Sequence, residues 1–199
     1  MLKKLILTSA LVLAMQAPAM AQDYNDGYDD PMTGLYLGAS GGYSWIDADT
    51  PTAGTELDLD GSEFGVFVGY KLDQWLQNSV GITGAVEAHY EWSIADDAEG
   101  TVGFEKDNSW GVQFRPGISV FESINPYGII GYKRAEFDAT TAGGTTSEDF
   151  DGFELGIGTE LVAYGDVGFR VDYTHTWYGE EAGFDPDEHA VKAGISYHF

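Results

Sequence analysis

The strongest constraint in this chain is an alternation of large apolar residues with small or polar ones, in runs of up to thirteen residues. Side chains of a β-strand point to opposite faces in turn, so each run predicts a strand with one apolar and one polar face. We find eight such runs, at residues 34–45, 63–72, 81–93, 108–120, 126–137, 150–162, 166–178 and 188–199. No comparable helical period follows Gly34.

The runs are longer than strands of globular sheets, which usually have about five or six residues. They match the roughly 9–11 residues of a tilted strand that crosses a bilayer. Eight is also an even number, and it is the smallest common size of such a membrane barrel. The sequence therefore predicts an all-β fold, an eight-stranded antiparallel transmembrane up-and-down β-barrel over residues 34–199.

The two faces of the runs differ in side-chain size. In residues 108–120, Trp110 and Phe114 share the apolar face, whereas Ser109, Gln113 and Arg115 share the polar face. Glycine and serine on the polar faces suit the crowded interior of a narrow barrel, and tyrosine and tryptophan on the apolar faces suit membrane interfaces. We expect the apolar faces to point outward, into lipid. The facing of residues 126–137 stays open, and a soluble barrel with an apolar, ligand-holding interior remains the alternative.

The N-terminus predicts export. Lys3 and Lys4 precede an apolar run, and Ala19-Met20-Ala21 fits the small-x-small cleavage rule, so we expect a signal peptide over residues 1–21 that is cleaved after Ala21. The mature chain then has 7 basic and 33 acidic residues, a formal charge of −26, and begins with a flexible acidic arm at residues 22–33. Such a charge opposes binding to nucleic acid.

The gaps between the runs alternate in length. Long gaps are predicted as loops at residues 46–62, 94–107, 138–149 and 179–187, with short turns on the other side. This pattern is typical of barrels with both termini in the periplasm. The four predicted loops hold 17 acidic residues and one basic residue, Lys106, so we expect a strongly anionic outer surface.

The closing segment Ala190-Val-Lys-Ala-Gly-Ile-Ser-Tyr-His-Phe199 resembles the last strand of bacterial outer-membrane barrels, with Tyr197 and the terminal aromatic Phe199 at alternate positions. The segments Leu35–Trp45, Gly65–Lys71 and Gly152–Glu160 strengthen the likeness. Together they resemble the small eight-stranded barrels related to the OmpA transmembrane domain and the opacity-type porin-family proteins of Gram-negative bacteria. The resemblance implies that Tyr197 and Phe199 form the signal read by the barrel-assembly machinery. It also implies that the partners are outer-membrane lipid and lipopolysaccharide.

The polar faces predict a network of charges in the lumen. Enclosed charges must be paired or hydrated, because unpaired burial costs several kcal/mol. The expected members are Lys71, Glu87, Glu91, Arg115, Glu154, Glu160, Arg170, Asp172 and Lys192. The interior of an eight-stranded barrel is only just filled by side chains, so we expect a salt-bridged plug in preference to an ion path.

We expect no enzyme activity, cofactor or metal site. Lipid A deacylases of this barrel class use a His-x-Ser pair, but Trp177 stands where a serine should follow His175. His89 has no serine at matching spacing, and His198 is next to the terminus. Glu56–Gly61 is similar to the start of an EF-hand loop, but Phe67 replaces the required bidentate glutamate.

The sequence thus predicts a closed barrel with a structural role in the envelope and adhesion-type interactions of its surface loops with an external ligand. A narrow porin is the alternative, and a lipid-modifying enzyme is a third class.

Overall fold

The computed structural model describes residues 33–49, 56–77, 80–99, 102–120, 124–141, 144–164, 166–179 and 185–199. The predicted signal peptide (residues 1–21) and the predicted acidic arm (residues 22–33, apart from Thr33) lie outside these residues.

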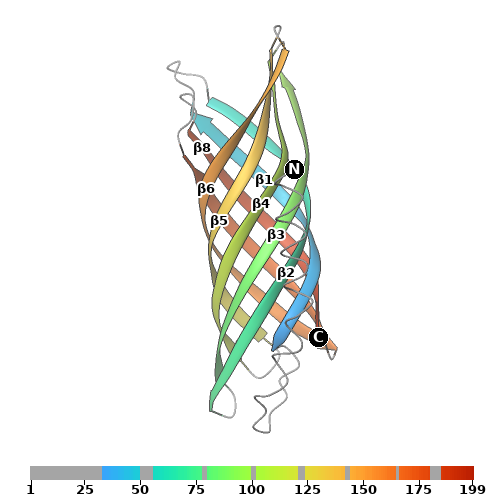
Figure 1. Cartoon of the computed structure of the whole chain (residues 1–199), viewed down its shortest axis with the longest axis vertical. Coiled ribbons are helices and arrows are strands. Elements are labelled where there is room, and N and C mark those ends of the chain that lie inside the picture. Colours follow the sequence, from blue (N-terminus) through green and yellow to red (C-terminus); the bar gives the residue numbers. More distant parts are fainter. Residues whose placement is uncertain are drawn as a thin grey trace, which may run out of the picture.

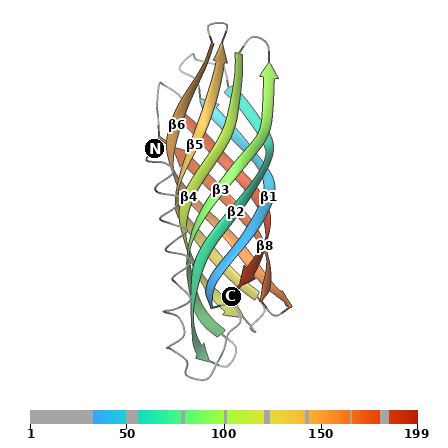
Figure 2. The same ribbon diagram turned by 45° about the vertical axis from the view of Figure 1, so that its right-hand side comes forward.

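Eight strands form one closed antiparallel barrel in chain order (Figures 1 and 2), which confirms the predicted fold class. The strands are β1 (Gly34–Asp49), β2 (Glu56–Gln77), β3 (Val80–Glu99), β4 (Val102–Val120), β5 (Ile124–Thr141), β6 (Gly144–Tyr164), β7 (Val167–Tyr178) and β8 (Asp185–His198). Pairing of β1 with β8 closes the barrel, and the Phe199 amide donates to the Leu35 carbonyl at 2.9 Å. We call the end that holds Gly34 and Phe199 the terminal end, and the opposite end the hairpin end.

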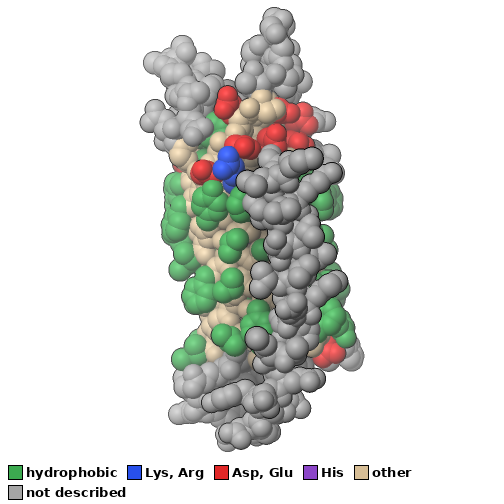
Figure 3. All heavy atoms as spheres, in the orientation of Figure 1, with side chains coloured by type: hydrophobic (Ala, Val, Ile, Leu, Met, Phe, Trp, Pro, Cys, Tyr) green, Lys and Arg blue, Asp and Glu red, His purple; other side chains and the backbone are tan. Residues whose placement is uncertain are grey.

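The outer wall is apolar, as expected. On β4, Trp110, Val112 and Phe114 are exposed, and Ser109 and Gln113 are buried, which confirms the predicted facing. The open question on β5 is resolved, because Ile129 is 1% exposed inside the barrel and Ile130 is 46% exposed outside it. Hydrophobic side chains cover the wall below a rim of acidic groups (Figure 3). In the described part of the chain, no helix is long and apolar enough to cross a membrane.

The predicted long loops are wrong in extent. β1 continues to Asp49 and β2 begins at Glu56, while β3 and β4 are separated only by residues 100–101, and β5 and β6 only by residues 142–143. Most of 46–62, 94–107 and 138–149 is therefore strand. The physical reason is that the ladder of backbone hydrogen bonds needs no apolar face on the strand, so it continues beyond the apolar wall.

Closure of the barrel depends on a close approach of β1 to β8. A Cβ atom at Gly42, which faces inward, would collide with the Val191 carbonyl oxygen and lie 2.8 Å from the Lys192 Cα. The neighbouring Gly41 faces outward, and its Cβ would come no closer than 3.3 Å, to the ring of Phe64. The two adjacent glycines therefore differ in the room available to a side chain.

We expect Gly42→Val to destabilise the barrel by about 1–3 kcal/mol, since it forces backbone movement at the closing seam. Gly41→Val should stay near the wild type. The measurement is the free energy of unfolding in urea, together with the mobility of boiled and unboiled samples on a gel. Equal losses in both variants would contradict the packing of this seam.

Candidate functional site

The interior of the barrel holds its charged side chains in layers along the axis. All nine residues predicted for the lumen are buried, on strands β2 to β4 and β6 to β8. The predicted assembly-signal residues Tyr197 and Phe199 are exposed on the outer wall instead, where their rings contact each other at 5.0 Å between centroids.

A central layer crosses the middle of the lumen. Glu87 lies 3.1 Å from Arg115 and 2.6 Å from Arg170, and Asp172 lies 3.0 Å from Arg115 and 3.4 Å from Arg170. Tyr36 donates a hydrogen bond to Glu87 at 2.9 Å, and the Tyr127 hydroxyl donates one to Asp172 at 2.5 Å. Two carboxylates and two guanidinium groups thus balance each other, and the tyrosines satisfy the remaining acceptors. The layer comprises Tyr36, Glu87, Arg115, Tyr127, Arg170 and Asp172.

A ring of six alternating charges lies toward the hairpin end. Each lysine in it contacts two glutamates, and each glutamate contacts two lysines. The circuit runs through Glu63, Lys106, Glu188, Lys133, Glu91, Lys192 and back to Glu63. The nitrogen–oxygen distances of the longer contacts are 2.8 Å for Lys106–Glu188 and Lys133–Glu188, 3.1 Å for Lys133–Glu91 and 3.2 Å for Lys192–Glu63. The ring has no net charge.

A smaller terminal layer lies near the chain ends. The Lys71 ammonium is 3.4 Å from Glu160, and His198 Nε2 is 3.2 Å from the same carboxylate. Ser196 donates to Glu160 at 2.7 Å. A cavity of about 20 Å³ lies between this layer and the central layer, with Lys71, Arg115 and Arg170 among its lining residues. It has room for about one water molecule.

Glu154 and His89 lie between the central layer and the ring. Glu154 accepts hydrogen bonds from Gln113 at 2.6 Å and Thr176 at 3.3 Å, and it has no lysine or arginine within ion-pair distance in the described chain. His89 is buried, and neither of its ring nitrogens has a hydrogen-bond partner among the described residues. Glu154 was predicted as a member of the charge network, but the structure surrounds it with neutral donors.

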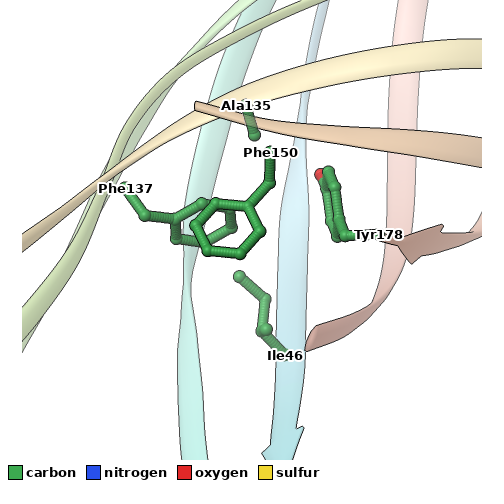
Figure 4. Close-up of a cluster of buried hydrophobic side chains, with 5 residues drawn as sticks. All are labelled: Ile46, Ala135, Phe137, Phe150 and Tyr178. Carbon is green, nitrogen blue, oxygen red and sulfur yellow. The ribbon is translucent and has the colours of Figure 1, made fainter. Parts of the chain in front are cut away.

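A cluster of buried apolar side chains, which we call the apolar cap, lies next to the ring toward the hairpin end of the lumen, and Figure 4 shows its five residues. The Phe137 ring lies 5.3 Å from Phe150 and 5.7 Å from Tyr178, between centroids. The Tyr178 hydroxyl donates to Glu188 at 2.5 Å and so joins the cap to the ring of six charges. The cap comprises Ile46, Ala135, Phe137, Phe150 and Tyr178.

Four members of the ring and the whole cap were missed from the sequence. The interpretation of Lys106 as a base in an external loop is wrong, because its side chain is 2% exposed inside the barrel. Glu188 and Glu63 stand at the ends of runs, and Lys133 belongs to the run whose facing stayed open. The alternation could have placed two of them. Lys133 and Phe137 are an even number of residues from Ile129, so they lie on the same inward face of β5.

The outer wall is almost free of basic groups. Of the lysines and arginines in the described chain, only Arg134 points outward, where it contacts Asp149 at 3.0 Å and Asp151 at 3.4 Å. His175 and His189 also face outward, with their rings stacked at 4.0 Å. No group of three or more potential metal ligands occurs among the described residues.

Comparison with known proteins agrees with this geometry. The family model described as "Outer membrane protein beta-barrel domain" matches residues 7–199. The chain belongs to this family of outer-membrane β-barrels. The family and the eight-stranded architecture together confirm the resemblance drawn from the sequence, and they place this barrel protein in the bacterial outer membrane.

Solved structures of other outer-membrane barrels are similar to this chain, and NspA shares its fold. The Neisserial surface protein A, NspA, is 14% identical, with a TM-score of 0.60 over 84% of this chain and 98% of that chain. Ail, the attachment invasion locus protein of Yersinia pestis, is 17% identical over 83% and 100% of the two chains, with a TM-score of 0.48. The N-terminal barrel domain of Pseudomonas aeruginosa OprF is 12% identical over 80% and 97%, with a TM-score of 0.45. No curated protein matches this chain in sequence.

The terminal layer of this outer-membrane barrel brings a serine, a histidine and a glutamate together. A catalytic triad places its acid and its serine on opposite nitrogens of the imidazole. Here Ser196 Oγ, at 3.3 Å, and Glu160 Oε1, at 3.2 Å, approach the same nitrogen, Nε2 of His198. The serine hydroxyl also donates directly to Glu160. The cluster therefore has the geometry of a buried hydrogen-bond network rather than that of a nucleophile with its base.

We expect Arg170→Ala to lower the free energy of unfolding by about 3–5 kcal/mol, because it leaves buried carboxylates of the central layer without one of their two cations. The matched control is Arg134→Ala, which removes an exposed cation with two carboxylate partners and should cost about 0–1 kcal/mol. The measurement is urea unfolding in lipid vesicles, followed by tryptophan fluorescence. Equal costs for the two variants would indicate a hydrated lumen.

Proposed function

We propose that this protein is a closed barrel with a structural role in the outer membrane, which presents its hairpin end to partners outside the cell in an adhesion-type role. The observation that carries the proposal is the filled lumen, in which three charged layers are stacked below an apolar cap. A pore needs a continuous hydrated path. The cavity between the lower layers holds about one water molecule by volume.

The remaining parts of the proposal concern export and orientation. The signal peptide is cleaved after Ala21, both termini lie in the periplasm, and the hairpin end faces outward. Tyr197 and Phe199 are the signal for the barrel-assembly machinery, and the apolar wall contacts lipid and lipopolysaccharide. The protein is not an enzyme; the position of Ser196 and Glu160 on one nitrogen of His198 supports this.

We expect Arg115→Ala to leave conductance in a planar bilayer at the baseline of the wild type. Its loss opens space in the central layer only, and the apolar cap, with Phe137 and Phe150 at its centre, still obstructs the lumen. A large step from Arg115→Ala alone would favour the narrow porin instead.

The surface role is tested at the β5–β6 hairpin. We expect replacement of residues 139–146 by an Asn-Gly turn to keep the barrel folded, because Asp138 pairs with Ser147 and an Asn-Gly turn can close such a hairpin. It should reduce the retention of expressing cells on a cultured epithelial monolayer at least fivefold. The mobility of boiled and unboiled samples checks folding. Unchanged retention of a folded variant would contradict a role for this hairpin.

A further inference from the structure

The barrel wall divides at the hairpin end. β2 and β3 pair only up to Glu63 and Ser93, and β6 and β7 pair only up to Gly152 and Tyr178. Strands β3, β4, β5 and β6 nevertheless stay paired with one another beyond these points, and they rise above the rest of the barrel as a separate sheet (Figure 1). The last strand of this sheet, β6, pairs with β5 through residues 144–151.

We call the side of β6 that faces away from β5, over residues 144–151, its free edge, because it pairs with no strand among the described residues. In the described part of the chain, no strand pairs with it there, since β7 ends at Tyr178 and β8 begins at Asp185. The Asp151 carbonyl on this side accepts from the Gly179 amide at 2.9 Å. In an antiparallel strand, the N–H and C=O groups of every second residue point to the same side. Asp149, Ser147 and residue 145 therefore direct their N–H and C=O groups toward the free edge, as Asp151 does.

The protection of this edge against strand pairing is acidic. Natural sheets protect an edge with charged side chains, most often lysine, with proline or with a β-bulge. Residues 144–151 contain neither lysine nor proline, and their pairing with β5 runs without a register shift. The residues present are exposed acids, Glu148, Asp149 and Asp151. A second copy of the same edge would place these acids against one another, so the charge opposes pairing between copies of this chain.

The neighbouring strand shows what this edge accepts. Arg134 of β5 lies opposite Asp151 in the register, and its guanidinium contacts Asp149 at 3.0 Å and Asp151 at 3.4 Å. Ser147, Asp149 and Asp151 share one face of β6, because they are two residues apart. A strand added at the free edge could place a cation beside the same two carboxylates, from the side opposite to Arg134.

We propose that the free edge of β6, residues 144–151, binds an extended polypeptide segment that carries lysine or arginine at alternate positions and adds it as a further strand. This inference rests on the proposed function, since it names the kind of partner that the hairpin end takes. Backbone hydrogen bonds hold the added strand, and its alternate cations contact Asp149 and Asp151.

The test measures binding of a fluorescent ten-residue peptide of alternating lysine and threonine. The protein is the full barrel in phosphatidylcholine nanodiscs, which carry no net charge, and the readout is fluorescence anisotropy. The control peptide has the same sequence with alternate amides N-methylated, which keeps the charge and removes one edge of backbone donors. We expect the unmodified peptide to bind at least tenfold more tightly than the N-methylated one.

A pair of protein variants tests the edge itself. Ser147→Pro removes an N–H that points to the free side and obstructs an added strand, so it should weaken binding at least tenfold. Ser147→Ala keeps that N–H and should bind within twofold of the wild type. Equal binding of the two peptides to the wild type would overturn the proposal, since it would reduce the interaction to surface charge. The comparison of the two peptides on the wild-type protein tests the proposal even if Ser147→Pro fails to fold.

The outcome separates the two proposals. If replacement of residues 139–146 abolishes cell retention while both peptides bind equally, the surface role stands and only the edge-binding mechanism is overturned. If retention is unchanged in that variant, the role of the hairpin in adhesion fails, whatever the peptides do.

Discussion

Charge pairing inside the barrel is the constraint on which the rest of the structure depends. A narrow tube enclosed by lipid brings its inward side chains together without bulk water, and any unpaired charge there is costly. The chain solves this with a ring in which three lysines and three glutamates alternate, and with a central layer of two carboxylates and two arginines. Because each partner comes from a different part of the chain, these contacts also fix which strands can face each other across the lumen.

The outside of the molecule follows from this use of the basic residues. Nearly every lysine and arginine of the described chain lies in the lumen, so the acidic residues beyond the wall have little cationic compensation, with Arg134 as the exception. The interior is close to neutral while the exterior is strongly anionic. Such a distribution favours partners that bring positive charge and disfavours association between copies of the chain.

At the hairpin end, the lumen is filled, while among the described residues the free edge of β6 stays accessible to a partner. Phe137 and Phe150 close the lumen from within, yet the same strands continue upward and leave the wall as a sheet. Inward residues near this end thus fill the barrel, whereas residues 144–151 of β6 pair with a described strand on the β5 side alone. A rigid wall that carries exposed strand edges is a suitable scaffold for surface interactions, because the edge is held in an extended conformation before a partner arrives.

The sequence by itself determined the strand number, the outward apolar faces and the inward position of residues such as Glu87, Arg115 and Arg170, because a period of two is a local property that one face in lipid and one in the lumen impose on each strand. It could not determine where the strands end, because backbone pairing needs no apolar face and continues past the apolar wall. Only the tertiary structure decided that Lys106 lies inside, that Glu63, Lys133 and Glu188 complete a ring, and that no described strand pairs with the free edge of β6. Those contacts join residues from up to five strands, and they depend on the register of the closed barrel, which no single strand encodes.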